Sequence, residues 1–447
     1  MAGLTESLAR FAADPGFRAL PEEAARIVTT GFIDTVAALL AGRNEPVVGI
    51  LAQFIAAKQS IAREAHVLLG PGMATSADAA LINATASHAL DFDDVALGGH
   101  PSVVLVPAVL AEGEHLNASG ADVMRAYLVG YEVWAELFSR EPDALHIKGW
   151  HPTGVLGTVG AAAAVAHLHQ LSAGGCSNAL ALAASMASGL VANFGTMAKP
   201  LHAGRAAACA IEAVRLAAAG LSAAPDAIEH RAGYLAALSP QGRADRTNPA
   251  AGLGSRLRIL EHGLSIKKYP MCYATHRVID GVLDLVIAHD VKPDNVREIR
   301  ASIGATQASM LRNHAPVTAL EAKFSLEFAA ACALVARTVG LQELTDEFVA
   351  RGPVRAAMRK VVTTTVDTHC PHEPAMALAD RVAIDLDDGR TLESGDIRFA
   401  RGNAKLPLLD AELKAKFLDC SGGAAPLYER LQGLAGLGSV RTLMARD

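Results

Sequence analysis

Residues 21–42 read PEEAARIVTTGFIDTVAALLAG, and their pattern sets the fold class expected for most of the chain. Pro21 and the acidic pair Glu22–Glu23 suit the first turn of a helix, where carboxylates meet the positive end of the helix dipole. Gly42 ends the segment. Between these ends, apolar side chains recur at the three-to-four-residue spacing of one helical face: Ile27, Phe32, Val36, Leu39 and Leu40. We therefore predict a long helix with one buried face.

Helical patterning of the same kind fills the first part of the chain, and strand-like alternation does not interrupt it. It recurs over residues 77–92, 101–118, 121–139, 152–170, 176–192 and 204–220. Near the C-terminus, LLDAELKAKFLDC and APLYERLQGL are helical again. We expect a large all-α domain made of residues 1–263 and 403–447.

The pattern changes after Lys267. Residues 296–304 (VREIRASIG) and 359–367 (RKVVTTTVD) alternate like strands, and 381–396 form a hairpin with Asp388-Gly389 as its turn. Helices are expected between them, over 275–289 and 319–340. The sequence thus predicts a smaller α+β lid domain over 264–402, in a protein of mainly-α fold class.

Composition excludes several classes of function. Hydrophobic residues make up 51% of the 447 residues, which is enough for a large core. The net charge of -6 and the lack of a cationic stretch give no support for nucleic-acid binding. The six cysteines include no C-x-x-C pair, which excludes the common zinc and iron–sulfur spacings. Free thiols in a reducing compartment are expected, and no secretory signal is visible, so we predict a cytoplasmic protein.

Residues 149–198 contain no Asp, Glu, Lys or Arg, a run long enough for two membrane spans. The run is nevertheless built from Ala, Gly, Ser and Thr, and it includes His151, His167 and His169. We interpret it as helices buried inside a soluble protein without a membrane segment.

Carboxylates and imidazoles gather in residues 88–102, HALDFDDVALGGHPS, between apolar neighbours. If the preceding helix persists, His88, Asp91 and Asp94 share one face, while Asp93 points elsewhere. The aspartates could instead cap helices, which is a common role of this residue. The concentration of such groups in a buried segment indicates a candidate site.

A histidine precedes a proline twice, at His100-Pro101 and at His151-Pro152. Proline favours the first position of a helix, so both imidazoles are expected at helix N-termini. That position keeps an imidazole neutral and attracts a substrate anion. Glycines three apart in the second helix allow another backbone to approach closely: Gly154, Gly157 and Gly160.

Lys199 is the first charge after the neutral run, and a buried ammonium needs an anion. His202 lies within one turn of it. Near the expected domain boundary, Lys268 and His276 are further candidates. THCPH at 368–372 offers histidines and a cysteine, but without a distant partner motif we expect no zinc there.

The motifs HALDFDD…GHPS, GWHPTGVLGTVGAAAA, NFGTMAKPLHAGRAA and KKYPMCYATH occur in an order that resembles the MmgE/PrpD family across essentially the whole chain. The resemblance implies a large helical domain, a smaller α+β lid, a homodimer, and no metal or organic cofactor. It places the active site on Asp91, His100, His151, Lys199 and His276. Candidate substrate-binding residues are His146, Lys268, Arg277 and His202.

The family includes 2-methylcitrate dehydratases, cis-aconitate decarboxylases and iminodisuccinate epimerases. All of them make or quench a carbanion beside a carboxylate. A neutral histidine would move the carbon-bound proton, Lys199 and the helix N-termini would stabilise charge, and Asp91 would orient an imidazole. The sequence thus predicts a lyase or isomerase that acts on a small di- or tricarboxylate.

The leading interpretation is a 2-methylcitrate dehydratase-like lyase, with an iminodisuccinate epimerase-like isomerase as the alternative. GWHPT, NFGTM-x-KP and CYA-x-H are similar to the epimerase branch, although His146 replaces a tyrosine expected there. Decarboxylase-type members carry a threonine and a tyrosine where this chain has Val95 and Phe328. A cis-aconitate decarboxylase and a non-catalytic carboxylate-binding protein are the further alternatives.

Overall fold

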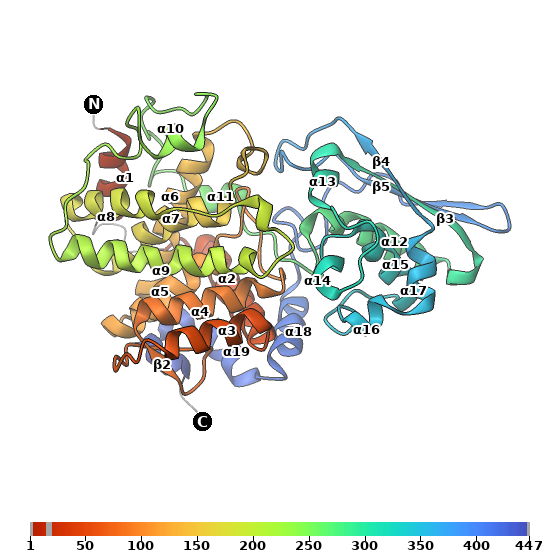
Figure 1. Cartoon of the computed structure of the whole chain (residues 1–447), viewed down its shortest axis with the longest axis horizontal. Helices are drawn as coiled ribbons and strands as arrows, with labels where there is room; N and C mark the ends of the chain where they lie inside the picture. Colours follow the sequence, from red (N-terminus) through yellow and green to blue (C-terminus); the bar gives the residue numbers. More distant parts are fainter. Residues whose placement is uncertain (1–2, 15–19, 445–447) are drawn as a thin grey trace. The chain divides into compact units, whose positions relative to one another are not determined.

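The computed structural model describes residues 3–14 and 20–444, and the chain forms two compact units (Figure 1). The first unit contains the residues up to 264 and those from 410 onward, and the second contains 265–409. These limits lie beside the predicted ones of 1–263 with 403–447 and of 264–402. That the units are independent domains stays a prediction.

The first unit is a helical bundle, as the mainly-α prediction requires. Its helices are α1 (Leu4–Ala12), α2 (Glu22–Gly42), α3 (Pro46–Ala56), α4 (Ser76–Ala89), α5 (Ser102–Leu116), α6 (Gly120–Ser139), α7 (Pro152–Leu168), α8 (Ala173–Met186), α9 (Ala198–Ala218), α10 (Tyr234–Leu238), α11 (Arg258–His262), α18 (Asp410–Ser421) and α19 (Ala425–Gln432). Short 3-10 turns add η1 (Leu145–Lys148), η2 (Val191–Asn193), η5 (Leu434–Gly436) and η6 (Val440–Met444). Each helix predicted in this region is present, and most ends lie within three residues of the predicted ones. The exceptions are α8, which ends six residues before the predicted end at 192, and α9, which begins six residues before the predicted start at 204.

One short sheet interrupts the helices. The strands β1 (Ala65–His66) and β2 (Met73–Ala74) pair antiparallel, so the prediction of a purely α-helical large domain is wrong at this point. Strands of two residues are too short to show the alternation that identifies a strand in a sequence.

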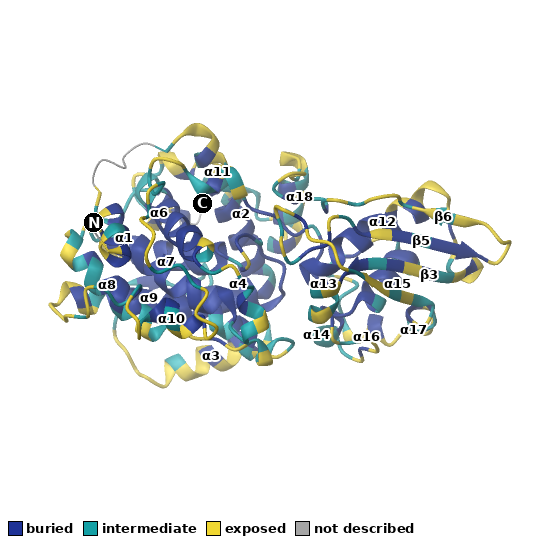
Figure 2. Ribbon diagram, turned by 90° about the horizontal axis from the view of Figure 1, so that it is seen from above, coloured by how far each residue is buried: buried dark blue, intermediate teal, exposed yellow. Residues whose placement is uncertain are grey.

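Small residues allow the central helices to pack closely. A β-carbon at Gly160 on α7 would lie 2.9 Å from the carbonyl oxygen of Gly130 on α6. The two backbones therefore meet where the glycine spacing predicts a close approach. Every side chain from Pro152 to Ala166 is buried, and Figure 2 shows α7 among the buried elements of this unit.

The helix α2 is long and apolar enough to cross a membrane by length and composition alone. In the structure, 67% of its apolar window is buried inside the protein. Core helices of soluble proteins share these properties, so α2 is weak evidence for a membrane. The neutral run at 149–198 forms α7, α8 and η2 instead of one long span.

The second unit contains a four-stranded sheet of order β4-β3-β5-β6. Its strands are β3 (Val296–Gly304), β4 (Val361–Val366), β5 (Arg381–Leu386) and β6 (Thr391–Glu393). Its helices are α12 (His276–Ala288), α13 (Ala305–Met310), α14 (Ala319–Ala322), α15 (Leu326–Ala336), α16 (Asp346–Val349) and α17 (Gly352–Met358), with 3-10 turns η3 (Tyr273–Thr275) and η4 (Pro293–Asn295). β3 pairs parallel with β4 and antiparallel with β5. The predicted strands and the hairpin are confirmed.

The helix predicted over 319–340 is wrong as one continuous element, because the chain breaks between α14 and α15. Ser325 begins the second helix, and its hydroxyl accepts a hydrogen bond of 3.1 Å from the backbone N–H of Phe328. Serine at an N-cap competes with helix continuation, which explains the break.

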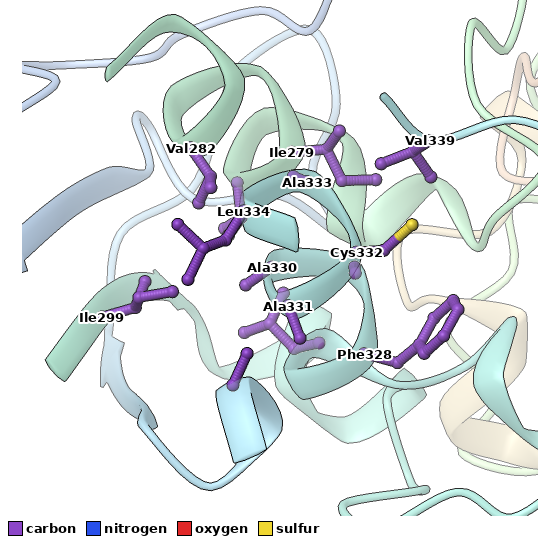
Figure 3. Close-up of a cluster of buried hydrophobic side chains, with 14 of the residues drawn as sticks. Ile279, Val282, Ile299, Phe328, Ala330, Ala331, Cys332, Ala333, Leu334 and Val339 are labelled. Atoms are coloured by element: carbon purple, nitrogen blue, oxygen red, sulfur yellow. The ribbon is translucent and has the colours of Figure 1, made fainter. Parts of the chain in front are cut away.

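The core of the second unit lies around α15 (Figure 3). Phe328 is 1% exposed in this core, together with Ile279 and Leu334. Its ring meets that of Phe348 edge-on at 6.3 Å between centroids. A phenylalanine at this position is therefore explained by packing.

Candidate active site

The helix α4 ends at Ala89, and the chain then turns sharply at Asp91, whose φ is 54°. Aspartate tolerates this left-handed conformation better than most residues. Because of this turn, His88, Asp91 and Asp94 do not share one helical face, and that prediction is wrong. The turn instead sends the three aspartates of this stretch to three different partners.

Asp93, predicted to point away, lies against two histidines. Its carboxylate oxygens lie 3.0 and 3.1 Å from Nδ1 of His88, and one of them lies 2.8 Å from Nδ1 of His100. Burial alone would raise the pKa of Asp93, but the two imidazoles outweigh burial and hold this pKa well below its usual range. Nδ1 of His88 thus donates to Asp93, and Nδ1 of His100 also lies 2.8 Å from the backbone carbonyl oxygen of Asp94, so both rings carry a proton on Nδ1.

Asp91 pairs with Lys199, which lies in the first turn of α9. Lys199 is 5% exposed, and its ammonium lies 5.3 Å from the ring centre of Phe194. Asp91 is also 3.9 Å from Nε2 of His100. The anion expected for this buried lysine is therefore supplied at least in part by the protein itself.

Asp94 has a structural role. It accepts from the backbone N–H of Ser102 at 3.3 Å, at the start of α5, and also contacts the hydroxyl of Ser102. Burial, with the nearby charge of Asp34, raises the pKa of Asp94 well above its usual range. Asp94 thus accepts from the first N–H group of α5, although Pro101 occupies the N-cap position of this helix.

His151 caps α7, and Pro152 follows it at the first helical position, as predicted. Its backbone N–H donates to the carbonyl of Gly189 at 3.0 Å. Its ring stacks on His88 at 5.8 Å, and its Nδ1 lies 3.1 Å from Nδ1 of His202. The Nε2 atom of His151 is buried and has no hydrogen-bond partner among the residues that the structure describes.

Four imidazoles of the cluster are held neutral: those of His88, His146, His151 and His202. Burial lowers the pKa of His88 to about 4, against the opposing effect of Asp93. Burial, His100 and Lys199 lower the pKa of His146 to about 4. The pKa of His151 falls well below its usual value through burial and the neighbouring His88 and Lys199, and burial with Lys199 lowers that of His202. At neutral pH these rings are proton acceptors.

A metal-ligand arrangement also occurs here. His88, Asp91, Asp93 and His100 each offer one ligand atom, and these atoms lie within 4.8 Å of one another. Both carboxylates, however, already contact a lysine or imidazole N–H groups. A cation would have to displace those contacts, so the expectation of no metal stays a prediction.

The remaining predicted residues belong to the second unit. His276 begins α12, is buried, and donates from Nε2 to the carbonyl of Met271 at 3.2 Å. The guanidinium of Arg277 donates to the backbone carbonyl of Ala377 at 2.8 Å and to the carboxylate of Glu373 at 3.1 Å. Arg277 is therefore bound by residues of its own unit. Lys268 is partly exposed. Roles for these residues in the site stay predictions.

The structure therefore brings together Asp91, His100, His151, Lys199, His146 and His202 in the first unit, from segments far apart in the sequence. Sequence reasoning missed His88 and Asp93. Both stand in the stretch that was singled out, but a regular helix would have separated them, and only the turn at Asp91 joins them.

The buried acid–base cluster on a helical bundle is a candidate active site, and comparison with known proteins identifies the family. Models of the MmgE/PrpD N-terminal and C-terminal domains match residues 6–247 and 269–433. The chain belongs to the MmgE/PrpD family, as the resemblance indicates.

Similar proteins include cis-aconitate decarboxylases. The one from Mus musculus is 31% identical over 355 residues, which cover 76% of this chain and 70% of that protein. The human one is 30% identical over 351 residues, 76% of this chain and 71% of that protein. A third, from Aspergillus terreus, is 26% identical over 350 residues.

Proposed function

We propose that this protein is a lyase that decarboxylates cis-aconitate or a closely related unsaturated tricarboxylate, without a metal or organic cofactor. The observation that carries the proposal is the contact between a buried lysine–aspartate pair and three imidazoles: Lys199, Asp91, His88, His100 and His151. The similarity to cis-aconitate decarboxylases supports this reaction over epimerisation.

The reaction needs an anion site, a way to stabilise a carbanion and a proton donor. Lys199 and the N-terminus of α7 would bind substrate carboxylates. When carbon dioxide leaves, the electron pair of the broken C–C bond forms a carbanion that is delocalised over the adjacent double bond and the carboxylate attached to it. An imidazole then delivers one proton to carbon, so that one proton is consumed for each carbon dioxide released.

Neutral imidazoles suit these reaction steps because substrate binding changes the environment of the rings. A bound polyanion favours the charged form of a nearby imidazole and raises its pKa. His88 and His146, which are neutral in the free site, would then become proton donors when substrate is present. The site would thus acquire its acid together with its substrate.

The two departures from the decarboxylase pattern, Phe328 and Val95, do not bear equally on the expected substrate. Phe328 packs in the core of the second unit against Phe348, so its missing hydroxyl is explained without reference to chemistry. Val95 lies in the same loop as Asp91 and Asp93 and is partly exposed. Val95 is therefore the position at which we expect substrate preference to differ from that of members with threonine.

The test is a comparison of three substrates in D2O, followed by NMR. With cis-aconitate we expect loss of carbon dioxide and one deuterium on carbon in the product. Dehydration of 2-methylcitrate without loss of carbon dioxide would instead support the dehydratase interpretation. Deuterium exchange in iminodisuccinate without net conversion would support the epimerase. Binding of all three acids without any reaction would contradict an enzymatic role.

We also propose that the protein is a homodimer, as the family resemblance implies, and that it is cytoplasmic. The cysteines are buried, and no disulfide joins them within the described part of the chain, which agrees with a reducing compartment. Light scattering on the purified protein would determine the oligomeric state, and a monomer at micromolar concentration would contradict the proposal.

A further inference from the structure

His151 and His202 form a pair whose members differ in access to water. His151 is 1% exposed, whereas His202, on α9, is only partly buried. Their Nδ1 atoms lie 3.1 Å apart, and the ring centres are 5.3 Å apart. The buried imidazole thus has a direct hydrogen-bond partner that reaches toward solvent.

The surroundings hold this pair in place. Phe194 meets His151 edge-on at 4.8 Å between ring centres, and His88 stacks on His151 at 5.8 Å. A β-carbon at Gly189 would lie 3.2 Å from Cγ of His202 and 3.3 Å from Cβ of His151. Gly189, whose φ is 137°, therefore leaves little room for a side chain beside the two histidines.

The contact also constrains the tautomers. Two neutral imidazoles that meet at Nδ1 can share only one proton there, so one ring donates and the other accepts. If His202 donates, His151 carries its proton on Nε2, the buried atom that has no partner among the described residues. Burial and the nearby Lys199 lower the pKa of both His151 and His202, which keeps both rings neutral between turnovers.

We propose that His202 is a positioning residue that fixes the tautomer of His151 and returns a solvent proton to it in each turnover. This proposal rests on the proposed function. When carbon takes the Nε2 proton of His151, Nδ1 of His151 takes the proton from Nδ1 of His202. In the same step His202 takes a proton from water on Nε2. After the product leaves, Nε2 of His151 takes a proton from solvent and the two relayed protons move back through His202 to water, which restores the starting tautomers. One solvent proton is thus consumed in each turnover.

The first experiment needs no turnover. Nitrogen-15 NMR of the histidine rings at neutral pH should show His202 as the Nδ1–H tautomer and His151 as the Nε2–H tautomer. Assignment of the signals uses the variants His202→Asn and His151→Asn. The reverse tautomers would overturn the proposal, whether or not the protein decarboxylates cis-aconitate.

The second experiment separates relay from orientation. The amide of His202→Asn can still donate to His151 but cannot pass on a proton, whereas His202→Ala removes both functions. We expect kcat for cis-aconitate to fall about 100-fold in both variants, with KM changed less than about threefold. Added imidazole should restore part of the rate of His202→Ala.

Two results would overturn the relay. Wild-type kcat in His202→Asn would mean that His202 only orients His151. A change confined to KM would mean that His202 is a substrate contact. His167→Gln is the matched control, because His167 is a partly buried histidine on α7 that donates to the carbonyl of Ala12 at 2.9 Å. Failure of wild-type decarboxylation would contradict the proposed function and leave the NMR test to decide the tautomers.

Discussion

Asp91 and Asp93 are two positions apart, yet one pairs with a lysine and the other with two histidines. The left-handed backbone at Asp91 separates the two carboxylates. Asp93 is thereby free to orient imidazoles, the role that sequence reasoning gave to Asp91. Asp91 instead compensates the charge of Lys199 inside the protein.

Lys199→Met should lower kcat/KM for cis-aconitate at least ~100-fold, because it removes the cation expected to bind and stabilise the substrate carboxylate. It should also lower the free energy of unfolding by roughly 3 kcal/mol, since Asp91 stays buried without the ammonium. Steady-state kinetics and urea denaturation measure the two effects.

Two variants separate charge from folding in this experiment. The double variant Lys199→Met/Asp91→Asn should regain much of the stability but none of the activity. Lys58→Met is the surface control, because Lys58 pairs with Asp78 at 2.5 Å and is well exposed. Undiminished turnover in Lys199→Met would refute its proposed role.

The stability of the protein should fall as the pH drops from about 6.5 toward 4, partly through His88. The pKa of this ring is lowered from 6.5 to about 4, so in this range the unfolded chain binds a proton that the folded chain does not. Urea denaturation at several pH values should therefore give a steeper slope for the wild type than for His88→Asn, which keeps a donor for Asp93 but does not titrate.

Asp94 contributes to stability with the opposite sign. Because its pKa is raised in the folded chain, the folded chain holds a proton that the unfolded chain has lost, and this lowers the free energy of unfolding as the pH rises. The contribution is present in both proteins and cancels in the comparison. Equal slopes for wild type and His88→Asn would show that His88 is not held neutral.

At the scale of the element, the sequence was a good guide wherever a helix is long and periodic. The predicted segments 121–139 and 152–170 match α6 and α7 within two residues at each end. Failures occurred where short-range polar contacts override periodicity, as at Ser325, or where an element is too short to show a pattern, as in β1. The partners of Asp93 could not be predicted, because they depend on backbone geometry outside any regular element.

Gly160→Ala should destabilise the protein by about 1–3 kcal/mol, because its β-carbon would lie 2.9 Å from the carbonyl of Gly130. The matched control is Gly174→Ala, since Gly174 lies in the exposed first turn of α8 and a β-carbon there meets nothing closer than 3.9 Å. This control should be neutral or stabilise by up to ~1 kcal/mol. Urea denaturation measures both, and equal effects would contradict the close approach of α6 and α7.

At the scale of the whole molecule, the first unit is assembled from segments separated by the whole of the second. Lys416 on α18 donates to the buried Asp34 on α2 at 2.6 Å and to the carbonyl of Phe92 at 2.7 Å. Phe92 stands between Asp91 and Asp93. The last part of the chain thus supports the loop that carries the site.

Lys416→Met should lower the free energy of unfolding by about 3 kcal/mol, because Asp34 is fully buried and loses its ion pair. It should also lower kcat, because the loop at Phe92 loses a donor. Lys414→Met, on the same helix, removes only an exposed pair with Glu429 and should cost less than about 1 kcal/mol. Equal losses in the two variants would contradict the supporting role of Lys416.

This discontinuous arrangement has a consequence during protein synthesis. Residues 1–264 leave the ribosome long before Lys416 is translated, so Asp34 and the aspartate loop emerge without their ammonium partner. Residues 265–409 emerge in between and contain their own sheet and core. Nascent chains arrested before residue 410 should therefore protect the β3–β5 sheet from protease while the aspartate loop remains open to cleavage.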